Sequence, residues 1–284
     1  MNILSIQSHV AYGHVGNSAA VFALQRLGCE VWPVHTVQFS NHTGYGAWRG
    51  EVFTAGMIDD VVSGIAERGV LSRCDGVLSG YVGSLDTAAA ILTAVGRVKA
   101  ANPGAAYCCD PVIGNRARGV FVQPGISDFF RDRALPAARI VTPNHFELDR
   151  LAGRDTTDMA QVLAAVAALH ARGPRAILVT SVAASETPVG HVDVIASDAA
   201  AQYLVRTPKL ATAGNGAGDL IAALFLYHYL GSGSVAEALA RATSSVFALL
   251  RRTLAAGASE LALIAAQDEL VAPSELFEPQ RIAP

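Results

Sequence analysis

The sequence has few charged side chains and contains no long apolar run. Charged residues make up 16% of the 284 positions, against about 25% in typical soluble domains, whereas hydrophobic residues make up 51%. This balance excludes intrinsic disorder, which requires few apolar residues and a high net charge. No segment reaches the ~18 consecutive apolar residues that span a bilayer, and we therefore expect no membrane partner.

A basic stripe and a disulfide framework are also missing. The net charge of −3 argues against a nucleic-acid partner. The apolar stretch 1–6 has no basic residues before it and gives way at once to polar residues, which is unlike a secretory signal. The four cysteines show no C-x-x-C spacing, and the adjacent Cys108 and Cys109 are typical of buried free thiols. These features predict a soluble cytoplasmic protein.

Short apolar runs alternate with longer segments of helical period. Such alternation predicts right-handed crossovers and a mostly parallel sheet covered by helices on both faces. The expected parallel strands are 2–6, 30–37, 76–79, 106–109, 139–142 and 176–180. Two further strands, 189–195 and 202–206, are predicted to form an antiparallel pair at the sheet edge. The last helices are expected at 218–230, 235–250 and near 260–271.

Nothing along the chain divides it into separate units, although its length would accommodate two average domains. There is no internal repeat, no low-complexity linker and no sharp shift in composition. We therefore expect residues 1–284 to form a single α/β domain, a three-layer α/β/α sandwich.

Polar or glycine-containing segments follow the predicted strands one after another. In open α/β sheets, ligands bind beyond the carboxyl ends of the strands, and such segments should therefore meet at one cleft. The six segments are 7–9, 38–46, 80–81, 110–111, 144–147 and 180–181. Their convergence favours an enzyme.

The segment Gly214-Asn215-Gly216-Ala217-Gly218-Asp219 opens an apolar helix. Glycines let backbone N–H groups approach an anion, and a helix N-terminus adds its dipole. Asp219 would lie beside that anion and could accept a substrate hydroxyl's proton during phosphoryl transfer. An Asp near a helix start is also a favourable cap, but a cap needs none of the alternating glycines. Because neither G-x-x-x-x-G-K-[ST] nor an early G-x-G-x-x-G occurs, a nucleotide would use this segment.

A second motif, Thr142-Pro143-Asn144-His145-Phe146-Glu147, ends a predicted strand. Asn144 and Glu147 have the spacing of a capping box, which is one explanation of the motif. The functional alternative places both near bound phosphates, with Glu147 holding Mg²⁺ through water. Asp110 closes a neighbouring apolar strand, where packing alone does not explain a carboxylate, and is the second predicted metal carboxylate.

Histidines, aromatic rings and short hydroxyls are concentrated after the first two predicted strands. The set comprises Ser8, His9, Tyr12, His14, Phe39, Ser40, His42, Thr43 and Tyr45. Such a set suits a small polar aromatic ligand, because ring stacking supplies affinity and hydroxyls supply orientation. A Ser-His hydrolase is not favoured, since Ser8 lies outside any G-x-S-x-G elbow.

Taken together, these segments resemble the pyridoxal kinase family, the vitamin B6 branch of the ribokinase-like kinases. The resemblance covers residues 2 to about 271. It is carried by the segments 8–9, 12–17, 36–43, 79–81, 109–112, 142–147 and 216–219. It implies a ribokinase-like fold and ATP-dependent phosphorylation of the 5′-hydroxyl of pyridoxal, pyridoxine or pyridoxamine. It also implies Mg²⁺, an optional monovalent cation and a homodimer.

The same resemblance implies roles for individual residues. Asp219 matches the catalytic base, with Gly216, Ala217 and Gly218 as the anion hole. The substrate positions are Ser8, His42, Thr43, Gly44, Tyr81 and Asp219. The ATP positions are Asp110, Thr142, Asn144, Glu147, Thr180, Ser181, Thr207, Pro208, Lys209, Leu210, Gly216 and Gly218, with Asp110 and Glu147 as metal carboxylates. Two departures lie on the nucleotide side: Thr180 stands where many bacterial relatives carry lysine, and the stretch 206–213 is shorter than in close relatives.

Two functional alternatives stay open at this point. One is a ribokinase-like kinase for another small alcohol, such as hydroxymethylpyrimidine or a sugar; the early aromatic content argues against a sugar. The other is a non-catalytic pyridoxal phosphate-binding protein, against which Asp219 and Glu147 argue. Residues 115–119 are interpreted either as a flap over the cleft or as a solvated basic loop.

Overall fold

The computed structural model describes residues 1–211 and 215–283. Its strands are β1 (Asn2–Val10), β2 (Glu30–Phe39), β3 (Gly50–Val52), β4 (Gly76–Ser79), β5 (Ala106–Cys109), β6 (Gly114–Asn115), β7 (Gly119–Val120), β8 (Ile140–Val141), β9 (Ala176–Val182), β10 (His191–Ser197), β11 (Gln202–Pro208) and β12 (Gln280–Ala283). Its α-helices are α1 (Asn17–Arg26), α2 (Ala55–Glu67), α3 (Leu85–Ala101), α4 (Ile126–Phe129), α5 (Leu135–Ala137), α6 (His145–Ala152), α7 (Met159–His170), α8 (Ala217–Ser232), α9 (Val235–Ala255) and α10 (Asp268–Val271). Three short helices of other types are η1 (Thr43–Tyr45), η2 (Leu71–Arg73) and η3 (Phe130–Ala134).

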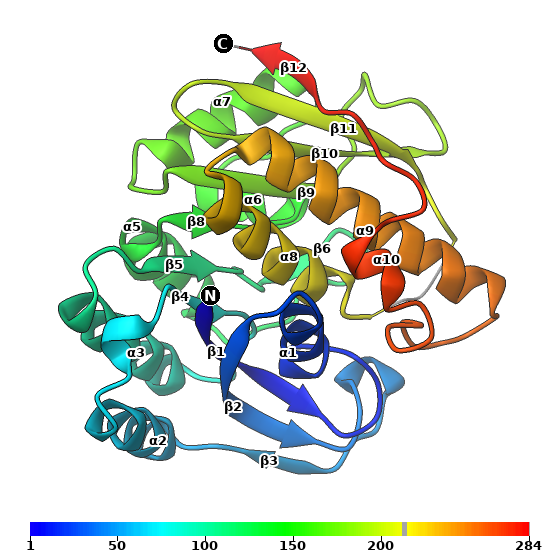
Figure 1. Ribbon diagram of the computed structural model, residues 1–284. Helices are drawn as coiled ribbons and strands as arrows, with labels where there is room; N and C mark the ends of the chain where they lie inside the picture. The colour runs from blue at the N-terminus through cyan, green and yellow to red at the C-terminus, as the bar shows by residue number, and fades with distance from the viewer. Residues whose placement is uncertain (212–214, 284) are drawn as a thin grey trace.

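Ten of the strands form one sheet in the order β12-β11-β10-β9-β8-β5-β4-β1-β2-β3. The run from β9 to β2 is parallel throughout, whereas β3 and the three strands β10 to β12 are antiparallel to their neighbours. Figure 1 shows β12 and β3 at opposite edges of this sheet. The predicted, mostly parallel sheet is thereby confirmed.

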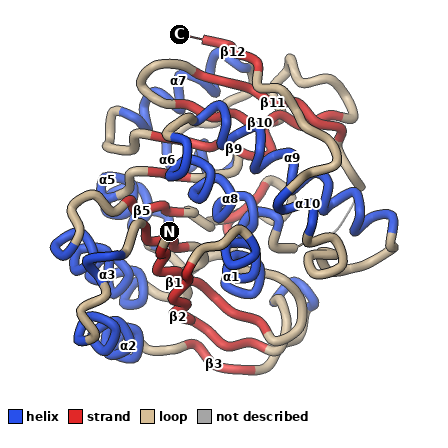
Figure 2. The backbone as a smooth tube through the Cα atoms, in the orientation of Figure 1, coloured by secondary structure: helices blue, strands red, loops and turns tan. Residues whose placement is uncertain are grey.

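Helices cover both faces of the sheet and complete the three layers (Figure 2). Along β1, Leu4 and Ile6 enter one core and Ile3 enters the other, as the two-residue period of a strand requires. The first core is closed by α2 to α7 and the second by α1, α8, α9 and α10. The three-layer α/β/α fold follows from strands that are apolar on both faces. Among the described residues, no helix is long and apolar enough to cross a bilayer.

Several predicted strand ends differ from the observed ones. The first strand continues to Val10 instead of ending at 6, and its pairing with β2 shifts register between Gln7 and His9. Two residues of β2, Thr36 and Val37, there lie opposite the single Ser8 of β1, which is a β-bulge in β2. The edge strands β3 and β12 and the hairpin β6–β7 were not predicted, because their sequences, GEV, QRIA, GN and GV, contain no apolar run.

The helix predicted near 260–271 is wrong for its first part, since α10 covers only Asp268–Val271. Leu261 and Leu263 are instead buried in the core beside α9. The backbone N–H of Ala262 donates to the hydroxyl of Thr253 at 2.9 Å, and Glu260 forms a bridge with Asn215. Tertiary contacts therefore override the local helical pattern here.

Five helices begin at a side-chain cap. Thr54, Ser84, Asn144, Asp158 and Ser234 each accept a hydrogen bond from the third residue of α2, α3, α6, α7 and α9. Helix α8 differs, because its N-cap is Gly216 and no side chain among the described residues caps it. The first N–H groups of α8 are thus left for another acceptor.

Candidate active site

A cavity of about 810 Å³ lies at the carboxyl ends of the parallel strands, within the ~300–1,000 Å³ typical of small-molecule sites. Each of the six polar segments that were predicted to converge contributes to its wall. One residue from each, in chain order, is Ser8, His42, Tyr81, Asp110, Glu147 and Thr180. The structure therefore brings these segments together, as parallel-sheet topology requires.

Most of the predicted site residues line this cavity. They are Ser8, His42, Thr43, Gly44, Tyr81, Asp110, Thr142, Asn144, Glu147, Thr180, Ser181, Gly216, Gly218 and Asp219. Among the described residues, the lining does not include Ala217 or the segment 207–210. That segment leaves β11, where the Lys209 N–H donates to the Gly190 carbonyl at 2.8 Å. Its ATP role stays a prediction, and Thr212, Ala213 and Gly214 lie outside the described residues.

The wall on the β1–β2 side is more apolar than predicted. Of the early rings, Phe39 and His42 line the cavity, whereas His9, Tyr12, His14 and Tyr45 do not. His9 instead lies against His35, with ring centroids 4.3 Å apart. The residues that sequence reasoning missed are Val10, Val15, Val37, Val112 and Phe121. The only sign of these residues in the sequence was an apolar side chain at the end of a predicted strand, and a residue of the hydrophobic core gives the same sign.

Asp219 lies in the first turn of α8 and faces the cavity. The N-cap residue is Gly216, at φ +90°, where a Cβ would overlap the carbonyl oxygen of His14. Asp219 is therefore not the capping residue. Burial raises the pKa of Asp219 to about 6, although hydrogen bonds from the backbone of Gly16 and of Asp219 itself act to lower it. A carboxyl group with such a pKa is suited to accept a proton near neutral pH.

Glu147 combines the two roles considered for it. Its Oε2 accepts the Asn144 N–H at 2.8 Å while the Asn144 side chain accepts the Glu147 N–H, which is a complete capping box. Its Oε1 accepts the N–H groups of Ile113 and Gly114 at 2.9 and 3.3 Å. Burial raises the pKa of Glu147 to about 7 despite these hydrogen bonds. Glu147 nevertheless lines the cavity.

Asp110 is the third carboxylate of the cavity, and it is buried. Its pKa is raised well above the usual range by burial and by the charges of Glu147 and Asp219, while the Thr142 hydroxyl acts to lower it. Because the charges of Glu147 and Asp219 raise the pKa of Asp110, the three carboxylates form a donor set that a divalent cation would neutralise. The described residues contain no group of three His, Cys, Asp or Glu side chains placed to hold a metal alone, and a nucleotide or water would supply the remaining ligands.

Thr180 and Ser181, two of the predicted ATP positions, lie at the end of β9 and line the cavity. Ser181 has a φ of +55°, a left-handed conformation that is uncommon for a residue with a side chain. The preceding Thr180 donates its N–H to the Pro143 carbonyl at 3.0 Å, which fixes it beside the Asn144–Glu147 turn. Backbone strain of this kind is found at functional sites.

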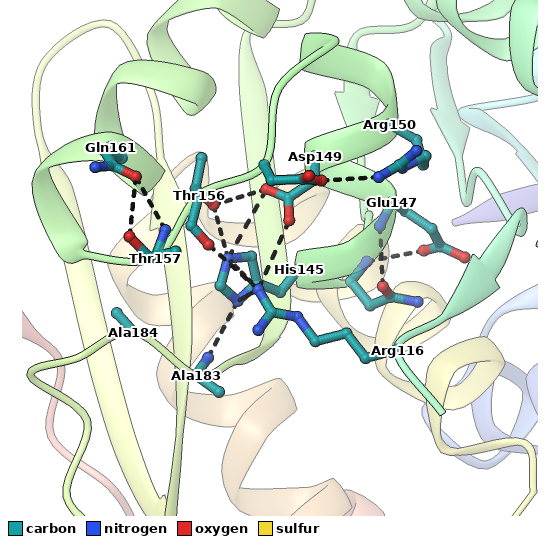
Figure 3. A network of polar contacts seen from close by, with 12 residues as sticks. Arg116, His145, Glu147, Asp149, Arg150, Thr156, Thr157, Gln161, Ala183 and Ala184 are labelled. Atoms are coloured by element: carbon teal, nitrogen blue, oxygen red, sulfur yellow. Dashed lines mark hydrogen bonds and ion pairs between the residues drawn. The ribbon is translucent and has the colours of Figure 1, made fainter. Parts of the chain in front are cut away.

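A buried polar network supports this side of the cavity (Figure 3). Ala183 donates its N–H to His145 Nδ1, which leaves Nε2 to donate to the Thr156 hydroxyl at 2.8 Å. That hydroxyl donates in turn to Asp149 at 2.6 Å. Burial lowers the pKa of His145, which keeps the ring neutral. Helix α6, the loop before α7 and the end of β9 are thus joined.

The hairpin β6–β7 contains residues 115–119, the predicted flap or basic loop. Arg116 reaches into the network, where its guanidinium lies 3.6 Å from Asp149 and donates to the Thr156 carbonyl at 3.3 Å (Figure 3). Asn115, Ala117 and Arg118 instead line the cavity. The hairpin therefore forms part of the cavity wall and is attached to α6 through Arg116.

Comparison with known proteins gives one family match and many full-length matches. A family model described as phosphomethylpyrimidine kinase matches residues 72–263. The chain is 56% identical to pyridoxal kinase PdxY of Granulibacter bethesdensis, over 99% of both chains. It is 54% identical to pyridoxal kinase PdxY of Rubrobacter xylanophilus, over 100% of this chain and 98% of the relative.

Solved structures agree with the full-length relatives. Pyridoxal kinase from Leishmania donovani in complex with ADP and pyridoxamine superposes with a TM-score of 0.91, at 27% identity over 99% of both chains. Pyridoxal kinase from Trypanosoma brucei gives a TM-score of 0.88 at 26% identity over 99% of both chains. The full-length matches are more informative than the family model, because they include residues 1–71 with Ser8 and Thr43.

Proposed function

The chain belongs to the pyridoxal kinase family, and we propose that it transfers the γ-phosphoryl group of ATP to the 5′-hydroxyl of pyridoxal. The product is pyridoxal 5′-phosphate, formed in vitamin B6 salvage. The observation that carries this proposal is Asp219, a carboxyl group with a pKa of about 6 in the first turn of α8 and in the same cavity as Asp110 and Glu147. Neither a pyridoxal phosphate-binding protein nor a kinase for hydroxymethylpyrimidine accounts for the full-length similarity to pyridoxal kinases.

In the proposed reaction, Asp219 acts as general base. Its carboxylate accepts the proton of the 5′-hydroxyl while the hydroxyl oxygen forms a bond to the γ-phosphorus. The bond from that phosphorus to its bridging oxygen breaks, and ADP leaves with the electron pair. In this proposal the backbone N–H groups of Gly216, Ala217 and Gly218, at the start of α8, stabilise the charge that develops on the transferred group.

The proposed metal is Mg²⁺ bound together with ATP, held by Asp110 and Glu147, with water between the metal and the protein. When bound, the ion would neutralise the charge of the transferring phosphates. The chain's own contribution is to keep two carboxylates buried side by side, fixed by Thr142 and by the capping box of α6. Asn144, Thr180 and Ser181 complete the proposed phosphate side, and a monovalent cation is a further proposal from the family resemblance.

The proposed vitamer site lies opposite, between β1, β2 and β4. Val10, Val15, Val37 and Phe39 offer an apolar surface to a pyridine ring, and the hydroxyl groups of Ser8, Thr43 and Tyr81 are available to its polar substituents. Pyridoxine and pyridoxamine fit the same description. His42 and Gly44 complete the lining on this side.

The decisive experiment is an ATP-consumption assay with pyridoxal, pyridoxine, pyridoxamine, hydroxymethylpyrimidine and ribose. We expect turnover with B6 vitamers and none with ribose. Turnover of hydroxymethylpyrimidine alone would replace the proposal by its nearest alternative. Binding of pyridoxal phosphate without turnover of any vitamer would indicate a binding protein.

We also propose that residues 1–284 act as one domain, as a homodimer and in the cytoplasm. One sheet containing both Asn2 and Ala283 supports the single domain.

Exposed apolar side chains on the edge strand β3 and on α2, namely Val52, Met57 and Val61, support self-association. Sedimentation of the wild type and of Met57→Glu tests the dimer, and we expect the variant to sediment as a monomer. Four buried free cysteines support a reducing compartment.

A further inference from the structure

Glu260 joins three loops that are far apart in the sequence. Its Oε1 accepts a hydrogen bond from the Tyr45 hydroxyl at 2.5 Å, and its Oε2 accepts one from the His14 N–H at 3.2 Å. Its backbone forms a parallel bridge with Asn215. None of the motifs that indicate phosphoryl transfer includes Glu260, which follows α9.

Two of the contacts of Glu260 lead to the substrate side of the cavity. Tyr45 ends η1, whose other residues, Thr43 and Gly44, line the cavity. His42 precedes η1 and caps it by accepting the Gly44 N–H at 3.1 Å. Tyr45 itself is exposed, and burial of its ring therefore does not explain where η1 lies. The hydrogen bond to Glu260 is the shortest contact of the Tyr45 side chain, which also approaches Ser259 and the ring of Tyr12.

The other contacts lead to the proposed base. His14 lies two residues before Gly16, whose backbone acts to lower the pKa of Asp219, and the His14 carbonyl oxygen lies against Gly216, the N-cap of the helix that carries Asp219. At Gly13 a Cβ would overlap the Glu260 carboxylate, which shows how closely this loop approaches. Asn215 directly precedes Gly216, the N-cap of α8. The side chain of Glu260 therefore supports the loop beside Asp219, and its backbone supports the segment that starts α8.

Glu260 is itself held firmly. The neighbouring Leu261 and Leu263 are buried at 3% and 0% exposure. Thr253 accepts the Ala262 N–H at 2.9 Å and donates to the Leu249 carbonyl at 2.8 Å, which ties this segment to the end of α9. A carboxylate on such a rigid segment can fix the more exposed loops that it contacts.

We propose that Glu260 is a positioning residue for phosphoryl transfer: it fixes η1 against the vitamer through Tyr45 and fixes the Asp219 loop through His14. This inference rests on the proposed function. It assigns separate consequences to the two oxygens of one side chain. Loss of the Tyr45 contact affects vitamer binding, whereas loss of the whole carboxylate also affects the catalytic rate.

Steady-state kinetics of the full-length protein test this with Tyr45→Phe, Glu260→Gln and the double variant. Tyr45→Phe removes one hydroxyl. We expect KM for pyridoxal to rise about five- to tenfold, the effect of losing one charge-assisted hydrogen bond, and kcat to stay unchanged. Glu260→Gln should raise KM for pyridoxal by at least as much and lower kcat about tenfold. KM for MgATP should stay within about twofold in every variant.

The double variant should lose less than the sum of the two single variants, because both changes act on the same Tyr45–Glu260 contact. Glu275→Gln is the matched control, since this exposed glutamate pairs with Arg251 in the same C-terminal part of the chain. The positioning role is overturned if Glu260→Gln leaves KM for pyridoxal unchanged, or if it raises both KM values equally and lowers the melting temperature. Failure of the wild type to phosphorylate any vitamer would instead contradict the proposed function.

Discussion

Thr142 donates its hydroxyl hydrogen to Oδ1 of Asp110 across 2.9 Å and so links the ends of the neighbouring strands β5 and β8. Both side chains are buried and both line the cavity. The bond acts to lower the pKa of Asp110, which burial and two nearby carboxylates raise. A single hydroxyl therefore helps to keep a proposed metal carboxylate ionised.

Replacing that hydroxyl should weaken nucleotide binding. In Thr142→Val, Asp110 loses a hydrogen bond to its charged form, which is worth about 1.5 kcal/mol or more, and KM for MgATP should rise about tenfold. KM for pyridoxal should not change. Thr93→Val, on the exposed face of α3, is the control for the same substitution. An unchanged KM for MgATP would show that Asp110 does not act on the nucleotide.

Removing the proposed base should abolish most turnover without abolishing substrate binding. For Asp219→Asn we expect kcat to fall by about 10²–10⁴, the usual range for a general base. Calorimetric titration should show pyridoxal affinity close to that of the wild type. Asp86→Asn changes a first-turn carboxylate of α3 and should leave kcat unaltered. Near-normal turnover in Asp219→Asn would indicate that Asp219 only stabilises the N-terminus of helix α8.

The pH profile should report the raised pKa of Asp219. Because a protonated carboxyl cannot accept the proton of the 5′-hydroxyl, kcat/KM should fall as the pH drops below about 6. The same acid limb should appear with pyridoxine and pyridoxamine, since it belongs to the enzyme. An acid limb near pH 4, the usual range of an aspartate, would contradict the environment described for Asp219.

The same shift has a consequence for folding without ligands. The folded state holds the Asp219 proton more tightly than the unfolded chain, so between pH ~4 and ~6 its contribution to stability falls as the pH rises. Asp219→Asn should therefore melt at a higher temperature than the wild type at pH 7.5. The difference should shrink towards pH 4 and vanish below about pH 3, where both states are protonated. Equal melting temperatures at both pH values would argue against a costly buried charge.

The network behind α6 should contribute to stability through Asp149. This carboxylate accepts the Thr156 hydroxyl and faces Arg116, and its side chain is 5% exposed. Asp149→Asn should lower the free energy of unfolding by about 1–3 kcal/mol in urea titration. Asp155→Asn breaks the exposed ion pair with Arg150 and should cost less than about 1 kcal/mol. Similar losses in the two variants would show that the network adds nothing beyond a surface pair.

The local features of this protein could be predicted from the sequence. The capping box of Asn144 and Glu147 and the parallel order of alternating strands and helices depend on neighbouring residues and on handedness. The placement of Asp219 in the first turn of α8 was predicted for the same reason. The polar segments after the predicted strands were enough to predict that Ser8, Asp110 and Thr180 would lie in one cavity.

The tertiary structure decided what depends on distant contacts. Glu260 binds Tyr45 across 215 positions of sequence, and no local pattern marks Glu260. The segment before α10 forms turns instead of a regular helix because Leu261 and Leu263 enter the core, although its sequence has a helical pattern. Val10 and Val37 look like core residues until the fold opens a cavity beside them. The sequence by itself determined the elements and the chemistry at their ends, whereas packing determined which side chains support that chemistry.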